Sequence, residues 1–95
     1  MIRVRFYLDA VSGQPHIYGH GVTEAEVEEV LERALEDRPG RDASRVALGK
    51  TRAGRYLRVI YVPDDDRLGL FVITAYDLHG KPLAALRRRM RRRSR

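Results

Sequence analysis

Side chains that can transfer a proton lie at two places in this sequence of 95 residues. His20 stands between two glycines just before a predicted helix, and Tyr76, Asp77 and His79 follow a hydrophobic segment. Histidine, tyrosine and carboxylate groups are suitable general acids and bases, so His20, Tyr76 and His79 are candidate catalytic residues. The alternative is structural, since His20 can cap the helix and the second group can simply mark the end of a strand.

The three histidines do not follow a spacing that is typical of a metal site, and the sequence has no cysteine. His16 and His20 would share a face only on a helix, and the neighbouring glycines disfavour a helix there. Without cysteine there are no disulfides, thiolate zinc sites or cysteine nucleophiles, which is compatible with a cytoplasmic location. We therefore expect neither a metal nor another cofactor.

Basic residues are concentrated at the C-terminal end. From Lys81 to Arg95 the chain has eight basic residues and no acidic one, whereas residues 1–80 hold 11 basic and 13 acidic residues. The formal net charge of +6 thus divides into a body of −2 and a C-terminal segment of +8. Cations that contact phosphates release counterions, so this segment predicts salt-sensitive nucleic-acid binding through Arg87, Arg88, Arg89, Arg91, Arg92 and Arg93. A solvated tail, or docking on the acidic helix of a second copy, is the alternative.

The body is itself polarised. Residues 23–37 carry seven acidic residues and one basic residue, whereas residues 38–58 carry seven basic residues and one acidic residue. Within the basic part, Tyr56 and Arg58 alternate with Leu57 and Val59, so the two pairs occupy opposite faces of a strand. The face with Tyr56 and Arg58 combines an aromatic ring with a cation and can bind nucleic acid, although ordinary sheet amphipathicity gives the same pattern.

These candidates depend on elements that the hydrophobic pattern predicts. We expect strands at residues 45–51, 55–62 and 68–76, and a first strand at 2–8 whose inward side chains are Ile2, Val4, Phe6 and Leu8. Thr23 and Glu26 form a capping box. Apolar residues at helical spacing follow, so we expect a helix that ends near Arg38, before Pro39 and Gly40. A short helix can begin at Pro82.

The predicted order is β-α-β-β-β-α, an α+β domain with one main helix packed on a mostly antiparallel sheet. The last three strands are joined by connections too short for crossovers, so they should form an antiparallel meander. We expect residues 1–86 to form one domain and residues 87–95 to be an arginine-rich tail. No apolar run approaches the roughly 20 residues of a membrane helix, so we expect no membrane association.

Three blocks of the sequence together resemble a known group of proteins. The first is His20-Gly21-Val22 with Thr23 and Glu26, and the last is Val72-Ile73-Thr74-Ala75-Tyr76. The middle block comprises Arg45, Leu48, Gly49, Thr51, Gly54, Arg55, Leu57 and Val59. In this order they resemble the BrnT-type toxins of bacterial type II toxin–antitoxin pairs, and equally a neighbouring uncharacterised domain family with the same strand pattern. Both are similar in fold to the RelE superfamily of small ribonucleases, so the resemblance implies a RelE-like fold over residues 16–90.

The resemblance also implies a chemistry. In RelE-like ribonucleases the RNA 2′-hydroxyl attacks the adjacent phosphate without a metal, and the protein supplies an acid, a base and cations. It places Lys50 and Arg52 among the phosphate-binding cations, where solvated edge-strand charge is the alternative. Arg55 belongs to the best-matching block and is expected to contact phosphate or a partner. The BrnT pattern tends to end the last strand with an arginine where this chain has Tyr76. Tyr76 is then either a substitute acid or base or a sign that activity has been lost.

The leading hypothesis is therefore a toxin that acts as an endoribonuclease, with RNA and a cognate antitoxin as partners. The phosphate ligands would be Lys50, Arg52, Arg55, Arg58 and the arginine tail, and His20, Tyr76 and His79 would transfer protons. One alternative is a non-catalytic domain that binds nucleic acid or a protein partner. Another is a homo-oligomer in which the acidic helix pairs with a basic face of a second copy.

Overall fold

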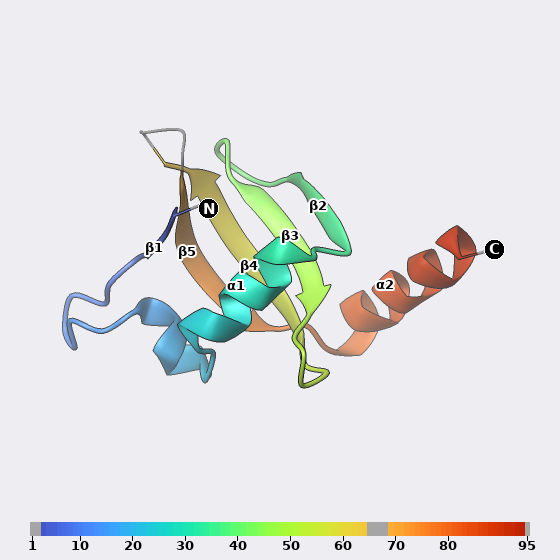
Figure 1. Cartoon of the computed structure of the whole chain (residues 1–95), viewed down its shortest axis with the longest axis horizontal. Helices are drawn as coiled ribbons and strands as arrows, with labels where there is room; N and C mark the ends of the chain where they lie inside the picture. The colour runs from blue at the N-terminus through green and yellow to red at the C-terminus, as the bar shows by residue number, and fades with distance from the viewer. Residues whose placement is uncertain (1–2, 65–68, 95) are drawn as a thin grey trace.

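The segments with alternating apolar and polar residues form a sheet in the computed structural model, which describes residues 3–64 and 69–94. Its strands are β1 (Arg3–Phe6), β2 (Glu36–Pro39), β3 (Arg45–Lys50), β4 (Tyr56–Pro63) and β5 (Gly69–Asp77). Their order among the described residues is β1-β5-β4-β3-β2, with β1 parallel to β5 and the other neighbours antiparallel (Figure 1). The predicted α+β class and the meander of β3, β4 and β5 are confirmed.

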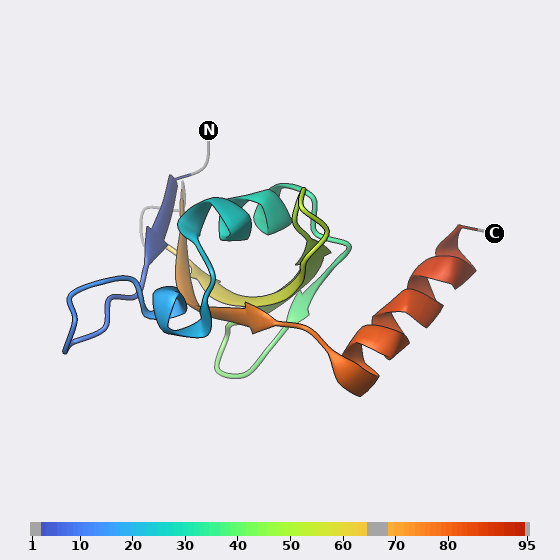
Figure 2. The same ribbon diagram turned by 90° about the horizontal axis from the view of Figure 1, so that it is seen from below.

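The main helix, α1 (Glu24–Glu32), lies in the concave side of the curved sheet (Figure 2). The predicted capping box is present, because the Thr23 hydroxyl accepts from the Glu26 N–H and the Glu26 carboxylate accepts from the Thr23 N–H at 3.0 Å. Val27 and Val30 are fully buried in one core cluster with Leu57 and Val59 of β4. The apolar stripe of the helix therefore builds the core.

Gly49 allows this packing to be close. A Cβ atom at Gly49 would lie 2.9 Å from Cγ1 of Val30, closer than carbon atoms normally approach. Val30 is β-branched and has little freedom to change its rotamer in a helix. A larger residue at position 49 would therefore push α1 away from β3.

The prediction that the helix continues to near Arg38 was wrong. The helix ends at Glu32, and Arg33 leaves the helical conformation with φ −135° and ψ 44°. The Leu35 N–H then donates to the Leu48 carbonyl at 2.8 Å, and β2 pairs with β3. After Leu35 the sequence offers no apolar residue that a longer helix could bury, whereas an edge strand needs few and tolerates Pro39 at its end.

Asp37 ties β2 to the body of the sheet. Its carboxylate accepts hydrogen bonds from the hydroxyl of Tyr61 on β4 and from Nε of Arg45, the latter at 2.8 Å. Burial of Tyr61, together with the negative charge of Asp37, raises the pKa of the phenol to about 12. Tyr61 therefore remains a hydrogen-bond donor at all ordinary pH values.

The first strand is shorter than predicted. Val4 and Phe6 pack against the core as expected, whereas Leu8 is 54% exposed and Ile2 lies outside the described residues. β1 ends at Phe6, and Leu8 forms an isolated bridge with Pro15 in the following loop. The expectation that the glycines disfavour a helix here was wrong: part of that loop is a 3-10 helix, η1 (His16–His20), anchored by the buried Ile17. The rings of His16 and His20 lie 5.2 Å apart.

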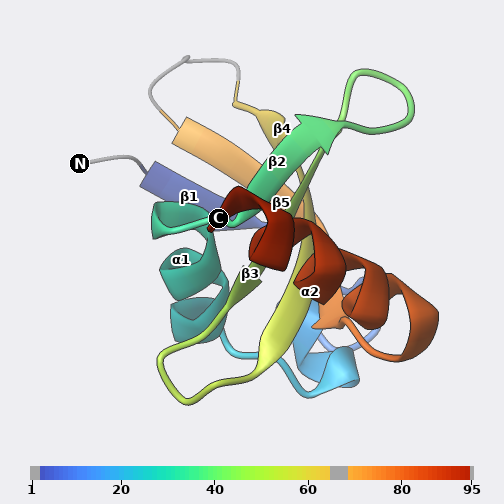
Figure 3. The ribbon, with the colours of Figure 1, turned by 90° about the vertical axis from the view of Figure 1, so that its right-hand side faces the viewer.

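The C-terminal helix, α2 (Gly80–Arg93), lies outside the curve of the sheet, on the side away from α1 (Figures 2 and 3). Leu86 is fully buried in a second apolar cluster, where Leu83 and Met90 also pack. Val46 and Leu48 supply the β3 side of this cluster. Residues 87–93, expected to begin an arginine-rich tail, continue α2 without a break.

One carboxylate fixes the far end of α2. Glu36, whose side chain is 7% exposed, accepts from Nε and Nη2 of Arg89 at 2.6 and 2.9 Å. Nη2 of Arg93 binds the same carboxylate at 3.0 Å, and its Nη1 donates to the Leu35 carbonyl at 3.1 Å. Hydrogen bonding to Arg89 is the main reason that the pKa of Glu36 lies below its usual range.

This ion pair should make part of the stability acid-sensitive. Because the pKa of Glu36 is lowered in the folded state, its contribution is complete above the usual glutamate value of 4.5 and is lost as the pH falls below it. We expect Glu36→Gln to lower the free energy of unfolding by about 1–3 kcal/mol at pH 7, measured by denaturant titration. The difference from the wild type should shrink below pH 4.5.

Glu28→Gln is the matched control, since Glu28 is exposed on α1. It should change the stability by less than about 0.5 kcal/mol. A difference between wild type and Glu36→Gln that stays constant from pH 7 to pH 3 would contradict the role of this ion pair.

Candidate functional site

Arg55 connects three segments at one end of the sheet. Its Nε donates to Oδ1 of Asp77 at 2.6 Å, and its Nη1 donates to the Gly21 carbonyl at 2.7 Å and to Oε1 of Glu26 at 3.1 Å. Hydrogen bonding to Arg55 is the main cause that lowers the pKa of Asp77. The guanidinium group expected to contact phosphate is therefore engaged inside the protein, where it joins β5 to the start of α1.

These bonds bring His20 next to Tyr76. Gly21 follows His20, and Asp77 follows Tyr76, so Arg55 holds the two neighbouring backbone segments together. The rings of His20 and Tyr76 lie 5.9 Å apart in an edge-to-face arrangement. Gly21 ends η1 with φ 70°, a left-handed conformation that suits glycine and turns the chain toward α1. His20 and Tyr76, both candidates for proton transfer, are thus in contact although they lie 56 positions apart in the sequence.

Arg58 completes this group. It pairs in register with Tyr76 across β4 and β5, so both side chains project from the same face of the sheet. Its Nε is buried and has no hydrogen-bond partner among the described residues, and the same holds for Oγ1 of Thr74. A buried guanidinium N–H without a partner is costly, and an anion that accepts from it would remove that cost.

An open groove of about 420 Å³, here called the Tyr76 groove, lies in front of these residues. Arg58, Tyr76 and His79 line it together with Lys81 and Pro82 at the start of α2. His79 is exposed and immediately precedes α2, so the turn into this helix positions it. All three candidate catalytic residues are therefore close to one end of β5, His20 through its ring contact and His79 through the groove.

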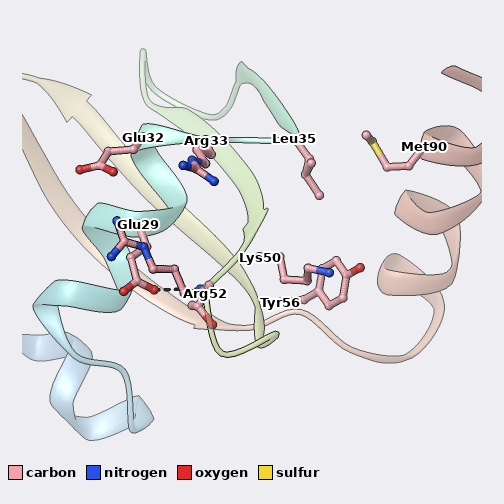
Figure 4. A pocket seen from close by; sticks show the side chains of 9 residues that line it. Glu29, Glu32, Arg33, Leu35, Lys50, Arg52, Tyr56 and Met90 are labelled. Atoms are coloured by element: carbon pink, nitrogen blue, oxygen red, sulfur yellow. Dashed lines mark hydrogen bonds between the residues drawn. The ribbon is translucent and has the colours of Figure 1, made fainter. Parts of the chain in front are cut away.

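Lys50 and Arg52 belong to a second groove, of about 490 Å³, between α1, the β3–β4 turn and α2 (Figure 4). We call it the Tyr56 groove. The N–H of Arg52 donates to Oε1 of Glu29 at 3.0 Å and so holds the turn against α1. Lys50 pairs in register with Tyr56, and its Nζ lies 5.6 Å from the centre of that ring.

The arginines of α2 serve different purposes. Arg89 and Arg93 bind Glu36 and anchor the helix, and Arg87 lies 5.2 Å from the ring centre of Tyr56. Arg88, Arg91 and Arg92 line an open surface on the outer side of α2. At 100° per residue they share one helix face, opposite the buried Leu86. Only some of the predicted phosphate ligands thus project freely into solvent.

No group of three or more histidine, aspartate and glutamate side chains suited to hold a metal ion occurs within residues 3–64 and 69–94. In this part of the chain, no helix is long and apolar enough to cross a membrane.

Two contacts among the candidate residues were not predicted from the sequence. The first is the pair of cations around Tyr56, and the second is the binding of Arg55 to Asp77 and Gly21. The register between β3 and β4 was the available signal for the first, because it places Lys50 opposite Tyr56. The second joins residues 22 and 34 positions apart, and no local pattern announces it.

Comparison with known proteins gives one match. A family model described as a domain of unknown function, DUF4258, matches residues 19–77, more than half of the chain. The matched range includes His20, Arg55, Arg58 and Tyr76, whereas His79 and α2 follow it. No curated protein and no solved structure gives a significant match.

The role of Arg55 can be tested directly. Arg55→Lys keeps the charge but cannot bind Asp77, Gly21 and Glu26 in the same geometry, because an ammonium group lacks the planar fork. We expect the His20 ring protons to lose the ring-current shift caused by Tyr76, measured by nuclear magnetic resonance. Tyr76→Leu defines the shift expected without the ring.

Arg52→Lys is the control, because Arg52 uses its backbone N–H, not its side chain, to bind Glu29. His20 signals that stay at their wild-type positions in Arg55→Lys would show that other contacts position this histidine.

Proposed function

The chain belongs to the DUF4258 family of domains of unknown function, and from its own site we propose that it is a small RNA-binding protein that cleaves RNA without a metal. The observation that carries this proposal is the group at the end of β5. Arg58 stands opposite Tyr76 with a buried, unpartnered Nε among the described residues, and the His20 ring contacts Tyr76. A cation and two proton-transfer groups from three elements are what phosphoryl transfer by a 2′-hydroxyl requires.

The division of labour follows from the chemistry. One of the pair His20 and Tyr76 takes the proton of the 2′-hydroxyl as its oxygen bonds to the adjacent phosphorus. Arg58 donates to the non-bridging oxygens, whose negative charge grows in the transition state. The bond from phosphorus to the 5′-oxygen then breaks, and the second group protonates that oxygen. The products are a 2′,3′-cyclic phosphate and a 5′-hydroxyl. His79, which lines the Tyr76 groove, is a further candidate for the general acid.

The outer face of α2 supports the binding part of the proposal. Arg88, Arg91 and Arg92 are exposed and project away from the sheet, so they can contact phosphates of RNA beyond the groove. The contribution of these contacts to the affinity is electrostatic and does not depend on the RNA sequence. It adds affinity without selecting a target.

The resemblance to BrnT-type toxins supports a biological role for such a nuclease. We infer that the protein is the toxin of a type II toxin–antitoxin pair, acts on RNA in the cytoplasm, and has a cognate antitoxin as its partner. The second candidate is a domain that binds nucleic acid without cleaving it. It is favoured by Tyr76 at the place of the BrnT arginine and by the internal role of Arg55.

Cleavage is tested with end-labelled RNA over a wide range of protein concentrations. We expect cyclic-phosphate products with the wild type, in the presence of a chelator, and a loss of at least about 100-fold in rate for Tyr76→Phe and His20→Asn. Tyr18→Phe is the matched control, because the Tyr18 hydroxyl binds Glu24 on α1 and is not part of the group. Unchanged RNA with the wild type at every concentration would eliminate catalysis and leave the binding domain.

Binding is tested by its salt dependence. Replacing Arg88, Arg91 and Arg92 together by Gln should reduce the slope of log affinity against log salt by about 2–3, since each phosphate contact contributes about 0.7–0.9. Arg41→Gln removes an exposed cation from the β2–β3 loop and should leave the slope unchanged. An unchanged slope in the triple variant would mean that α2 does not contact the nucleic acid.

A further inference from the structure

Two cations converge on Tyr56, outside the group proposed for cleavage. Nζ of Lys50 lies 5.6 Å and the guanidinium carbon of Arg87 lies 5.2 Å from the centre of the Tyr56 ring. They come from β3 and α2, and the ring comes from β4. Neither cation forms an ion pair with a carboxylate of the described residues, in contrast to Arg55 and Arg89.

The ring can hold both cations in place. A cation near an aromatic face is attracted by the negative potential of that face, and the attraction leaves its N–H groups able to bind an anion. Tyr56 is half-buried, so the ring is a firm support. From the sequence, Tyr56 was a candidate ring for contact with nucleic acid, whereas this arrangement favours a phosphate bound by Lys50 and Arg87.

The spacing relates this cluster to the cleavage site. Tyr56 and Arg58 are two residues apart on β4, which separates them by about 6.6 Å on one face of the sheet. Lys50 is opposite Tyr56 and Tyr76 is opposite Arg58, so two sets of a cation and a tyrosine stand side by side. Their separation is close to that of successive phosphates in an extended nucleic-acid strand.

We propose that Lys50, Tyr56 and Arg87 form a second phosphate subsite, which binds the phosphate next to the one held by Arg58. The identity of the ligand as RNA rests on the proposed function. An RNA strand then crosses β4 from the Tyr76 groove toward the Tyr56 groove, and the smallest good substrate has two phosphates. A dinucleoside monophosphate occupies only one subsite.

The subsite is tested by binding, without cleavage. Single-stranded oligodeoxynucleotides with one, two and three phosphates lack the 2′-hydroxyl, so they bind without reacting, and their affinities can be measured by nuclear magnetic resonance titration. We expect the affinity of the wild type to increase at least about tenfold when the oligodeoxynucleotide has two phosphates instead of one, as for a charge-assisted contact. Lys50→Gln/Arg87→Gln should abolish this gain.

Two further variants separate the subsite from net charge. Arg41→Glu changes the net charge by the same two units in the loop between β2 and β3, at the end of the sheet away from Tyr56, and should keep the gain. Tyr56→Phe keeps the ring and should also keep it, whereas Tyr56→Leu leaves both cations without their support and should lose it. Thermal melting of each variant checks that the fold is intact.

The outcomes distinguish this inference from the proposed function. A gain that survives in Lys50→Gln/Arg87→Gln, or that is equally absent from the wild type, overturns the subsite even if RNA is cleaved. A gain that depends on Lys50 and Arg87 supports the subsite even if no RNA is cleaved, and then the cleavage proposal alone fails. If the protein cleaves RNA, the wild type should cleave a trinucleotide with one ribose at least about tenfold faster than the dinucleotide. This difference in rate should disappear in Lys50→Gln/Arg87→Gln.

Discussion

The site depends on one guanidinium group. Arg55 is 28% exposed and binds the Asp77 carboxylate, the Gly21 carbonyl and the Glu26 carboxylate at distances between 2.6 and 3.2 Å. Glu26 also accepts from the Thr23 N–H, and this bond is the main reason that the pKa of Glu26 is low. The charge that caps α1 is thus the charge that fixes Arg55, so the start of the helix and the end of β5 form one unit. His20 and Tyr76 meet because their neighbours in the sequence belong to that unit.

The opposite charges of the two halves of the body are used in part inside the molecule. Acidic residues from the 23–37 region bind basic residues further along the chain, as Glu26 binds Arg55, Asp37 binds Arg45 and Glu36 binds Arg89. These pairs connect α1 to the turn before β4, β2 to β3, and β2 to α2. The sequence separates an acidic region from a basic one, whereas the Glu26–Arg55 and Asp37–Arg45 pairs join these two regions within the molecule. Exposed cations on α2, among them Arg88, Arg91 and Arg92, form a basic surface on its outer side.

Much of the fold could be predicted from the sequence, because strand alternation and the capping box are local signals. The end of α1 could not, since Arg33 and the following residues are compatible with a helix until β3 offers backbone partners to Leu35 and β2. The candidate residues were chosen by type, and the meeting of His20 with Tyr76 then depends on long-range packing. The functions of the arginines were harder to predict. Arg88 and Arg89 are chemically identical neighbours, and their positions around α2 decide that Arg89 reaches Glu36 whereas Arg88 faces solvent.

The parallel pairing of β1 with β5 has a consequence for folding during synthesis. The strand β1 cannot pair until β5 has been synthesised, because Arg3 pairs with Gly69 and Phe6 pairs with Val72. Arg55 likewise needs Asp77, so the contacts that bring His20 to Tyr76 form only after β5 has been synthesised. Contacts of such long sequence separation form late in folding. In a nascent chain, His20 and Tyr76 therefore stay apart until β5 has been synthesised and has paired with β1 and β4.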